Sequence, residues 1–388
     1  MLAGLPDGDE PMALDAPNIV NHLIFGPDDV DLSRSPLRRG LIDSTHVLGV
    51  FNPGMTRLPG GNLLLMVRVA EALDHPVDGA TVRTIRWTDD GYVTDPRPLA
   101  DVDSRDPRQF VLAGRANRLL CLTSLSWLLP VELDRDGTRV VAVHYDRIVA
   151  PAARFQDCGL EDPRISRIGD LWYMTVCAAS AERQSTLLYI ARNGLDYHPA
   201  GMVLDHQNKD MVLFEGMVGD HFMALTRPLG EVYLAYPARS PFAAGPSINL
   251  ARSPDGLHWK PLEAPFIRAR AGSTSAAKVG GGPPPIRTEK GWLMLYHGVE
   301  PGVPMGSYRC FWALLDADDP SHLLRLEDET PLLEADPALL APLAGKAYLP
   351  APVVFPTGIV NAGDHYLVAS GEGDLACRLS RIPLSCFS

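Results

Sequence analysis

A repeated pattern of short apolar runs separated by turns constrains this chain more than any other feature. Each repeat has a segment with Pro or Gly, a Gly or Asp turn, and an apolar or aromatic run that ends in polar residues. Clear copies begin at Phe51, Glu161, Leu213, Gly282 and Val353, and a fainter copy begins at Arg105. Repeats of roughly 50 to 70 residues, each a hairpin followed by further strands, are typical of β-propeller blades. The sequence therefore predicts an all-β fold with five or six such repeats.

Composition indicates a soluble globular protein. The chain has 388 residues, of which 46% are hydrophobic and 21% charged. Its net charge of −12 disfavours nucleic acid or an anionic membrane as a partner. The N-terminus lacks the pattern of a signal peptide, and no apolar run approaches the roughly 18 residues of a membrane span. We expect a cytoplasmic protein with no membrane partner.

Six cysteines are scattered along the chain without CxxC spacing. This pattern indicates neither a zinc site nor a disulfide framework, and we expect reduced thiols. HExxH and calcium-loop motifs are also missing from the sequence, so we expect no metal.

The repeats place polar residues at matching positions. In a propeller the inner strands crowd around a central channel, so such residues converge on one pocket. Sugar rings have apolar CH faces and hydroxyl edges, and they require aromatic rings interleaved with Asp, Asn and Arg. The polar residues are Asn52, Arg68, Asp162, Arg164, Lys209, Arg227, His297 and Asp374, and the nearby aromatic ones are Trp172, Tyr173, Trp292, Tyr296 and Tyr308. For Trp172 and Trp292 we favour core packing.

The stretch "GLEDPR" contains two adjacent carboxylates followed by a proline and an arginine. Proline disfavours helical backbone in the residue before it, which predicts an extended or turn conformation for Asp162. Neighbouring side chains of a strand point to opposite faces. We therefore expect Arg164 on the face of Asp162, and Glu161 outside the site.

Several segments together resemble the β-mannoside phosphorylases of glycoside hydrolase family 130. The matching segments occur in order from about Phe51 to Asp374. They include "FNPG", "LTSLSW", "GLEDPRIS", "NKDMVLF", "LTRP", "SPDGLHW", "KVGGGPPPIRTEKGWLMLYHGV", "YRCFWALLDADDPS" and "VVFPTG". The resemblance implies a five-bladed β-propeller, with the faint sixth copy inside a long first blade. We assign residues 1–40 to an N-terminal extension and residues 41–388 to a single catalytic domain.

The resemblance also implies a chemistry. Asp162 matches the general acid of inverting enzymes in which inorganic phosphate, the co-substrate, attacks the anomeric carbon of a β-mannoside and yields α-mannose 1-phosphate. In such enzymes the proton reaches the glycosidic oxygen through a mannose hydroxyl, and no cofactor is needed. The positions matching the phosphate site are Lys209, Arg227, His297 and Tyr308. Those expected at the sugar are Asn52, Arg68, Arg164, Asp210, Lys278 and Asp374.

Two alternatives remain open at this stage. Glu215 occupies a position where similar proteins have proline, and some relatives hydrolyse β-mannosides with glutamate as base. An inverting β-mannosidase would need a second carboxylate roughly 6.5–9.5 Å from the acid to activate water. A propeller that binds a glycan without cleaving it is the second alternative. The identity of the leaving sugar and the formation of a homo-oligomer are also left open.

Overall fold

Strands make up almost all the regular structure of this protein. The structure is a computed structural model that describes residues 18–113, 119–230, 233–302 and 305–387. Its α-helix, α1 (Pro337–Leu340), is a single turn. The predicted all-β class is confirmed. Short 3-10 helices lie at Pro27–Asp29, Leu32–Arg34, Pro36–Arg38, Leu99–Asp101, Tyr145–Arg147, Arg154–Gln156, Ala341–Lys346 and Leu384–Phe387.

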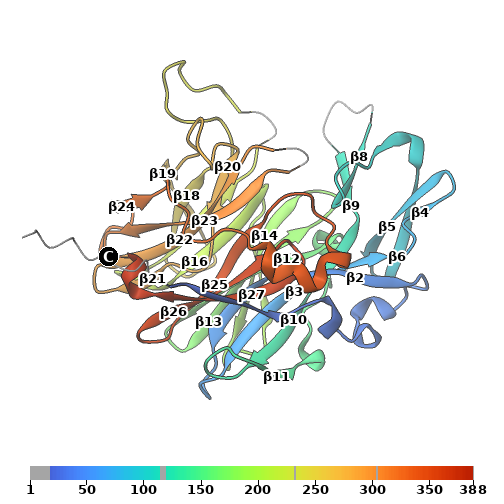
Figure 1. Cartoon of the computed structure of the whole chain (residues 1–388), viewed down its shortest axis with the longest axis horizontal. Coiled ribbons are helices and arrows are strands. Elements are labelled where there is room, and N and C mark those ends of the chain that lie inside the picture. The colour runs from blue at the N-terminus through green and yellow to red at the C-terminus, as the bar shows by residue number, and fades with distance from the viewer. Residues whose placement is uncertain (1–17, 114–118, 231–232, 303–304, 388) are drawn as a thin grey trace, which may run out of the picture.

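Within the described residues, antiparallel strands group into five units, which we number I to V (Figure 1). Unit I contains β2 (Thr45–Arg57), β3 (Leu63–Leu73), β10 (Ser124–Leu133) and β11 (Val140–Val143). Unit II contains β12 (Gly159–Ile168), β13 (Leu171–Ala179), β14 (Gln184–Ala191) and β15 (His198–Leu204). Unit III contains β16 (Asn208–Val218), β17 (His221–Pro228), β18 (Ile248–Ser253) and β19 (Lys260–Ile267). Unit IV contains β20 (Lys278–Gly281), β21 (Ile286–Thr288), β22 (Gly291–Glu300), β23 (Ser307–Leu315) and β24 (Leu323–Glu327). Unit V contains β25 (Val354–Asn361), β26 (His365–Glu372), β27 (Ala376–Pro383) and β1 (Val20–Phe25).

The boundaries between neighbouring units are marked by a change in strand pairing. Units I and II share only one parallel pair, Ser126 with Gly159. Units III and IV likewise share only the parallel pair of Glu215 with Ile286. Within each unit the pairing is antiparallel, as expected for strands joined by short turns.

Strand β1 at the N-terminal end completes unit V. It pairs antiparallel with β27, so the outer strand of this unit comes from the other end of the chain. The sequence predicts an N-terminal extension over residues 1–40, but Phe25 and Leu37 lie in the same buried cluster as unit I. Buried Glu71 adds a polar connection, because it accepts hydrogen bonds from Ser35 Oγ at 2.5 Å and Trp127 Nε1 at 3.0 Å. The segment from Val20 onward is therefore part of the folded body.

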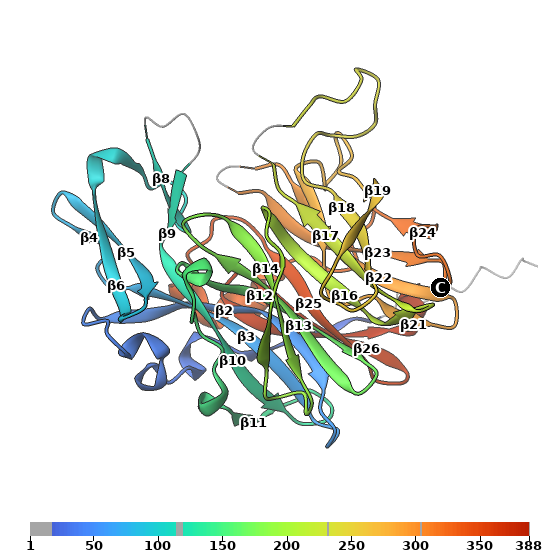
Figure 2. The same ribbon diagram turned by 180° about the vertical axis from the view of Figure 1, so that it is seen from behind.

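A strand-rich segment between β3 and β10 projects beyond unit I. It forms one small sheet of β4 (Val77–Asp78), β5 (Thr81–Thr88) and β6 (Gly91–Pro98) and another of β7 (Val102–Asp103), β8 (Gln109–Leu112) and β9 (Leu119–Leu122). We call the second sheet, described over residues 102–113 and 119–122, the arm. Both views place β4, β5 and β6 at the edge of the molecule opposite β24 (Figures 1 and 2). The faint sixth repeat, which begins at Arg105, lies in the arm.

Hydrophobic clusters hold successive units together. Each cluster combines buried side chains from two adjacent units, and burying one large apolar side chain stabilises a fold by about 1.5–3 kcal/mol. The clusters lead from unit I round to unit V and back to unit I. Examples are Leu64 with Met174 (I and II), Leu188 with Leu213 (II and III), Phe214 with Trp292 (III and IV), Trp312 with Ile382 (IV and V), and Leu63 with Leu379 (V and I).

No helix in the described part of the chain is long and apolar enough to cross a bilayer.

Candidate active site

All five units and the arm contribute side chains to one cavity of about 220 Å³. Nine residues that the sequence analysis singled out line it: Asn52, Arg68, Asp162, Lys209, Asp210, Arg227, Lys278, Tyr308 and Asp374. The first strands of the units contact one another, and this arrangement brings residues far apart in sequence together. Among the described lining residues, three predicted site residues do not appear: Arg164, His297 and Glu215.

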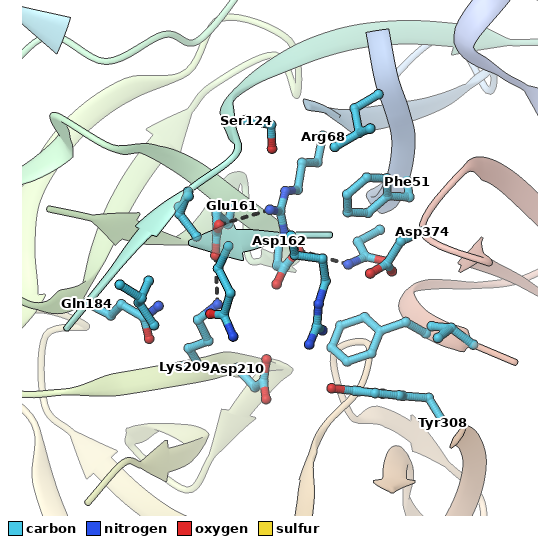
Figure 3. Close-up of a pocket in the computed structure, with 18 of the residues that line it drawn as sticks. Phe51, Arg68, Ser124, Glu161, Asp162, Gln184, Lys209, Asp210, Tyr308 and Asp374 are labelled. Atoms are coloured by element: carbon cyan, nitrogen blue, oxygen red, sulfur yellow. Dashed lines mark hydrogen bonds and ion pairs between the residues drawn. The ribbon is translucent and has the colours of Figure 1, made fainter. Parts of the chain in front are cut away.

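Asp162 lies near the middle of this cavity (Figure 3). Its Oδ1 accepts a hydrogen bond from Asn52 Nδ2 at 2.9 Å and one from Arg68 Nη1 at 2.8 Å. The sequence predicts an extended or turn conformation here, and the φ of Asp162 is +52°, in the left-handed region. Aspartate tolerates this region better than most residues. The conformation occurs at a register shift between β12 and β13, where the strand bulges around Asp162 and Pro163.

Charged neighbours control the protonation of Asp162. Burial alone would raise the pKa of this carboxyl, but Arg68, Arg164 and Lys209 outweigh burial and hold the pKa below its ordinary value. Surrounded by these protein groups, Asp162 is therefore ionised at neutral pH.

Glu161 shares the site, contrary to the expectation from strand alternation. Its Oε1 lies 2.9 Å from Arg68 Nη2, and its Oε2 lies 2.7 Å from Lys209 Nζ. The left-handed backbone at Asp162 and the bulge interrupt the alternation, so neighbouring side chains both reach the cavity. Glu161 is buried, which favours its neutral form, but Arg68 and Lys209 lower its pKa below the ordinary value.

Charged and phenolic groups lie on two sides of Asp162. In Figure 3, Lys209, Asp210 and Tyr308 lie on one side, and Arg68 and Ser124 lie on the other. Lys278 places its ammonium 5.0 Å from the centre of the Tyr308 ring. Burial lowers the pKa of Lys278 below its ordinary value. A bound anion would relieve the unfavourable burial of this charge.

Two buried side chains, Asp210 and His297, contact the guanidinium group of Arg227. Its Nη2 lies 2.9 Å from Asp210 Oδ2, and its Nη1 donates to His297 Nε2 at 3.2 Å. Because arginine is only a donor, His297 Nε2 must carry the lone pair, and the ring proton is on Nδ1. Burial lowers the pKa of His297 to about 3, so the ring is neutral. His297 is fully buried behind the cavity wall and supports Arg227, whereas the sequence predicted a phosphate contact.

Arg164 is also buried beneath the cavity. It donates from Nη1 to the carbonyl oxygen of Asp162 at 2.7 Å, and its Nη2 lies 3.1 Å from Asp210 Oδ1. Its guanidinium group therefore links the strand of Asp162 to the carboxylate that holds Arg227. Arg164 was expected on the face of Asp162 and at the sugar, but it does not line the cavity and has a supporting position behind it.

Asp374 lines the cavity near Arg68 and Arg108. Its φ is +50°, and Tyr348 donates from its hydroxyl to the Asp374 carbonyl at 3.3 Å. Burial raises the pKa of this carboxyl to about 6, although Arg68 and Arg108 act in the opposite direction.

Glu215 lies far along β16 from the cavity. It is six positions after Lys209 on this strand, and six strand residues span about 20 Å. Its backbone N–H donates to Pro285 O at 2.8 Å, at the junction of units III and IV. Burial raises its pKa to about 7. The carboxylate proposed as an alternative base is thus not part of this cavity.

Several lining residues were not predicted as site residues from the sequence, although some of them lie within the quoted motifs. The arm supplies Arg108, Gln109, Leu120 and Leu122, and unit V with its preceding loop supplies Tyr348, Val353 and Phe355; the remaining ones are Leu48, Phe51, Ser124, Glu161 and Gln184. The aromatic residues expected nearby are distributed differently. Tyr308 lines the cavity, whereas Trp172, Tyr173, Trp292 and Tyr296 belong to the clusters between strands. Core packing of the two tryptophans is confirmed.

No group of three or more His, Cys, Asp or Glu residues within the described ranges could hold a metal ion. The cavity instead combines carboxylates, cations and aromatic rings on an all-β scaffold, which is the chemistry of a carbohydrate site.

Comparison with known proteins identifies the family. Residues 127–386 match the family described as beta-1,4-mannooligosaccharide phosphorylase, which is glycoside hydrolase family 130. The chain therefore belongs to this family, and the resemblance noted in the sequence is confirmed.

Individual relatives support this assignment. The chain is 28% identical over 366 residues to beta-1,2-mannobiose phosphorylase of Listeria innocua, covering 88% of this chain and 90% of that protein. It is 31% identical over 219 residues to 1,2-beta-oligomannan phosphorylase of a Thermoanaerobacter species, covering 56% and 65% of the two chains. The solved structure of the Listeria innocua enzyme with beta-1,2-mannobiose has a TM-score of 0.76 at 24% identity, covers 95% of this chain and 97% of that chain, and supports the fold.

Proposed function

We propose that this protein is an inverting β-mannoside phosphorylase, and that units I to V are the blades of a five-bladed β-propeller. The reaction cleaves a β-mannosyl disaccharide or oligosaccharide with inorganic phosphate and gives α-mannose 1-phosphate and a shortened sugar. The observation that carries this proposal is that Asp162 lines the same cavity as three cations, Lys209, Arg227 and Lys278. Cations that can bind an anion near an acid suit phosphate as the nucleophile.

Bond making and breaking divide between the two sides of Asp162. On the side of Lys209 and Tyr308, a phosphate oxygen forms the new bond to the anomeric carbon. On the other side, the bond from that carbon to the glycosidic oxygen breaks, and the electron pair stays on this oxygen. The proton of Asp162 reaches the glycosidic oxygen through a mannose hydroxyl. The attack from the opposite side inverts the configuration of the anomeric carbon.

Phosphate binding would also prepare the acid. Arg68, Arg164 and Lys209 lower the pKa of Asp162. A phosphate dianion beside Lys209 offsets part of this positive charge and raises the pKa of Asp162. The acid therefore gains its proton more readily when the nucleophile is bound.

A β-1,2-linked mannoside is our proposed substrate. Support comes from the names of the Listeria innocua and Thermoanaerobacter relatives, both of which describe phosphorylases of β-1,2-mannosides. We further propose that the reaction uses no cofactor besides phosphate as co-substrate, and that the protein acts in the cytoplasm.

Hydrolysis is less well supported, because it needs a carboxylate base opposite the acid. Glu215 does not line the cavity, and the Glu161 carboxylate is occupied by ion pairs to Arg68 and Lys209. A propeller that only binds glycans would not need an acid beside an anion site.

A phosphate-dependence assay tests the proposal. The enzyme is incubated with β-1,2-mannobiose with and without phosphate, and mannose 1-phosphate and free mannose are quantified. We expect equimolar mannose 1-phosphate and mannose, only with phosphate. We also expect Glu215→Gln to retain turnover within about twofold, because its carboxyl lies outside the cavity. Full-rate release of two mannoses without phosphate, abolished by Glu215→Gln, would instead establish a hydrolase.

A further inference from the structure

We propose that the described residues of the arm, 102–113 and 119–122, form the binding subsite for the sugar that leaves, and that Arg108 and Gln109 select this sugar. The inference rests on the proposed phosphorylase function, and it identifies which surface recognises the second substrate. The arm contributes to the cavity wall, and it lies before residues 127–386, which are the residues that the family model matches.

One face of the arm points toward the cavity. Gln109 pairs with Leu122 across β8 and β9, and Val111 pairs with Leu120. Directly paired residues, and residues two apart on a strand, share one face. Gln109, Leu120 and Leu122 all line the cavity, so this shared face is the one that a ligand would meet. Phe110 on the opposite face is buried.

The polar groups that the arm contributes to the cavity, Arg108 and Gln109, are fixed before any ligand binds. Asp106 Oδ1 accepts from Arg108 Nε at 2.9 Å, and Asp106 Oδ2 accepts from Arg108 Nη2 at 2.8 Å. Asp106 Oδ2 also accepts from Gln109 Nε2 at 2.9 Å. Holding both side chains in one orientation reduces the entropy lost when they bind a ligand. The Arg108 Nη1 group and the Gln109 carbonyl oxygen are then available for sugar hydroxyls.

Apolar groups complete the chemistry of the subsite. Leu120 is 41% exposed although it lines the cavity, and Leu122 lies beside it on the same face. A pyranose ring can pack its CH face on these leucines while its hydroxyls bond to Arg108 and Gln109. This combination suits a neutral sugar better than a second phosphate, because an anion would gain nothing from the leucines.

The location of the arm agrees with the direction of the reaction. An inverting displacement requires the leaving group and phosphate on opposite sides of the anomeric carbon. Ser124, which begins β10 immediately after the arm, lies across Asp162 from Lys209 (Figure 3). The arm is tied to this position, because Thr123 donates from Oγ1 to Pro107 O at 2.8 Å and from its backbone N to Arg108 O at 3.1 Å.

The synthetic direction separates the two substrates. The enzyme is given α-mannose 1-phosphate and mannose as acceptor, and the KM of each is measured for wild type, Arg108→Ala and Gln109→Ala. We expect the acceptor KM to rise about tenfold in each variant, the loss of one charged or neutral hydrogen bond, with the KM of mannose 1-phosphate changed less than twofold. Arg105→Ala is the matched control, because its side chain is 87% exposed on the same arm and lies outside the cavity; it should change neither KM.

Equal increases in both KM values, or no increase in either, would overturn the inference. Leu120→Ala tests the same subsite without disturbing the ion pair between Arg108 and Asp106. This variant should also raise only the acceptor KM. Calorimetric titration with β-1,2-mannobiose in the absence of phosphate measures the affinity for the disaccharide without turnover. A wild type without phosphorolytic activity contradicts the proposed function, whereas unchanged mannobiose affinity in Arg108→Ala and Gln109→Ala contradicts the arm as a subsite.

Discussion

At the scale of single residues, the cavity depends on a backbone conformation that few residue types tolerate. Four non-glycine residues within the described ranges have positive φ: Asn52 at +51°, Asp162 at +52°, Asp210 at +56° and Asp374 at +50°. All four line the cavity. Asn and Asp adopt this left-handed region more readily than other non-glycine residues, at an energetic cost that the surrounding structure must offset. These residue types thus supply both the local turn and the polar group.

Removing the proton of Asp162 tests its role as the acid. Asp162→Asn preserves the shape of the side chain and can keep one hydrogen bond to a neighbour, but it has no transferable proton. Because general acid catalysis contributes about 10²–10⁴-fold, we expect kcat for mannobiose to fall by that factor. Steady-state phosphorolysis, with the melting temperature as a folding control, measures this.

An activated β-mannoside provides the matched comparison for this variant. A leaving group of low pKa, such as a nitrophenol, needs little protonation. The kcat of Asp162→Asn should therefore fall much less with a nitrophenyl β-mannoside than with mannobiose. Near wild-type turnover of mannobiose by folded Asp162→Asn would show that another group supplies the proton.

Asp374 predicts a pH dependence of stability. Its folded-state pKa of about 6 lies above the ordinary value of 3.8, so the folded protein keeps this proton where the unfolded chain has lost it. The resulting stabilisation is present below pH 3.8 and is lost as pH rises through about 6. Asp374→Asn cannot ionise and escapes this loss. We expect its melting temperature, relative to wild type, to increase by roughly a few degrees between pH 4.5 and pH 7.5. Parallel melting curves across this range would contradict the assignment.

At the scale of strands, close approach of backbone and side chains positions Arg227, a residue of the proposed phosphate site. Strand β20 pairs with β22 so that Gly280 lies opposite His297. A Cβ atom at Gly280 would lie only 2.4 Å from His297 Cε1 and 2.5 Å from Asp210 Oδ2. These are the two groups that hold Arg227, so the position requires glycine.

Gly280→Ala should therefore damage phosphate binding through Arg227. The added methyl group must displace His297 or Asp210, and a displacement of about 1 Å at a catalytic site can reduce activity by roughly 10²-fold. We expect the KM for phosphate to rise at least tenfold while the protein remains folded. Gly60→Ala is the control, because no described atom outside its chain neighbours lies within 4 Å of the place its methyl group would take; it should leave the KM unchanged. A normal phosphate KM in Gly280→Ala would show that Arg227 does not depend on this support.

At the scale of the whole molecule, the two ends of the chain meet in unit V. Strand β1 pairs with β27, and Phe25, 3% exposed, packs into the cluster shared by units V and I. This contact joins the last unit to the first. Its loss would affect the whole arrangement of units, because the cavity takes residues from all of them.

Phe25→Ala should weaken this closure. Truncation of a buried phenylalanine costs about 3–5 kcal/mol, which includes the cavity that it leaves. Urea denaturation followed by fluorescence should show a lower midpoint for Phe25→Ala. Val20→Ala, on the same strand but 52% exposed at the surface, should have a midpoint close to that of wild type. Equal effects of the two substitutions would mean that β1 does not contribute through the core.

The sequence determined the class of fold and most of the chemistry by itself. Its short apolar runs with Pro and Gly turns predicted strands, because these local preferences act over only a few residues. Its motifs identified nine residues that do line one cavity, including Asp162, Lys209 and Arg227. Such motifs are readable because each keeps its functional residues within a few positions of one another.

Only the tertiary structure decided which polar groups face the ligand and which support them. The bulge at Asp162 turns Glu161 into the site, and burial places Arg164 and His297 behind it. Distance along β16 removes Glu215 from the cavity, although it is only six positions from Lys209 in the sequence. The arm brings Arg108 to the cavity that Asp162 also lines, although Asp162 is 54 residues further along the chain, and no local pattern encodes this proximity. These placements depend on how strands from different units pack, and that packing involves the whole chain.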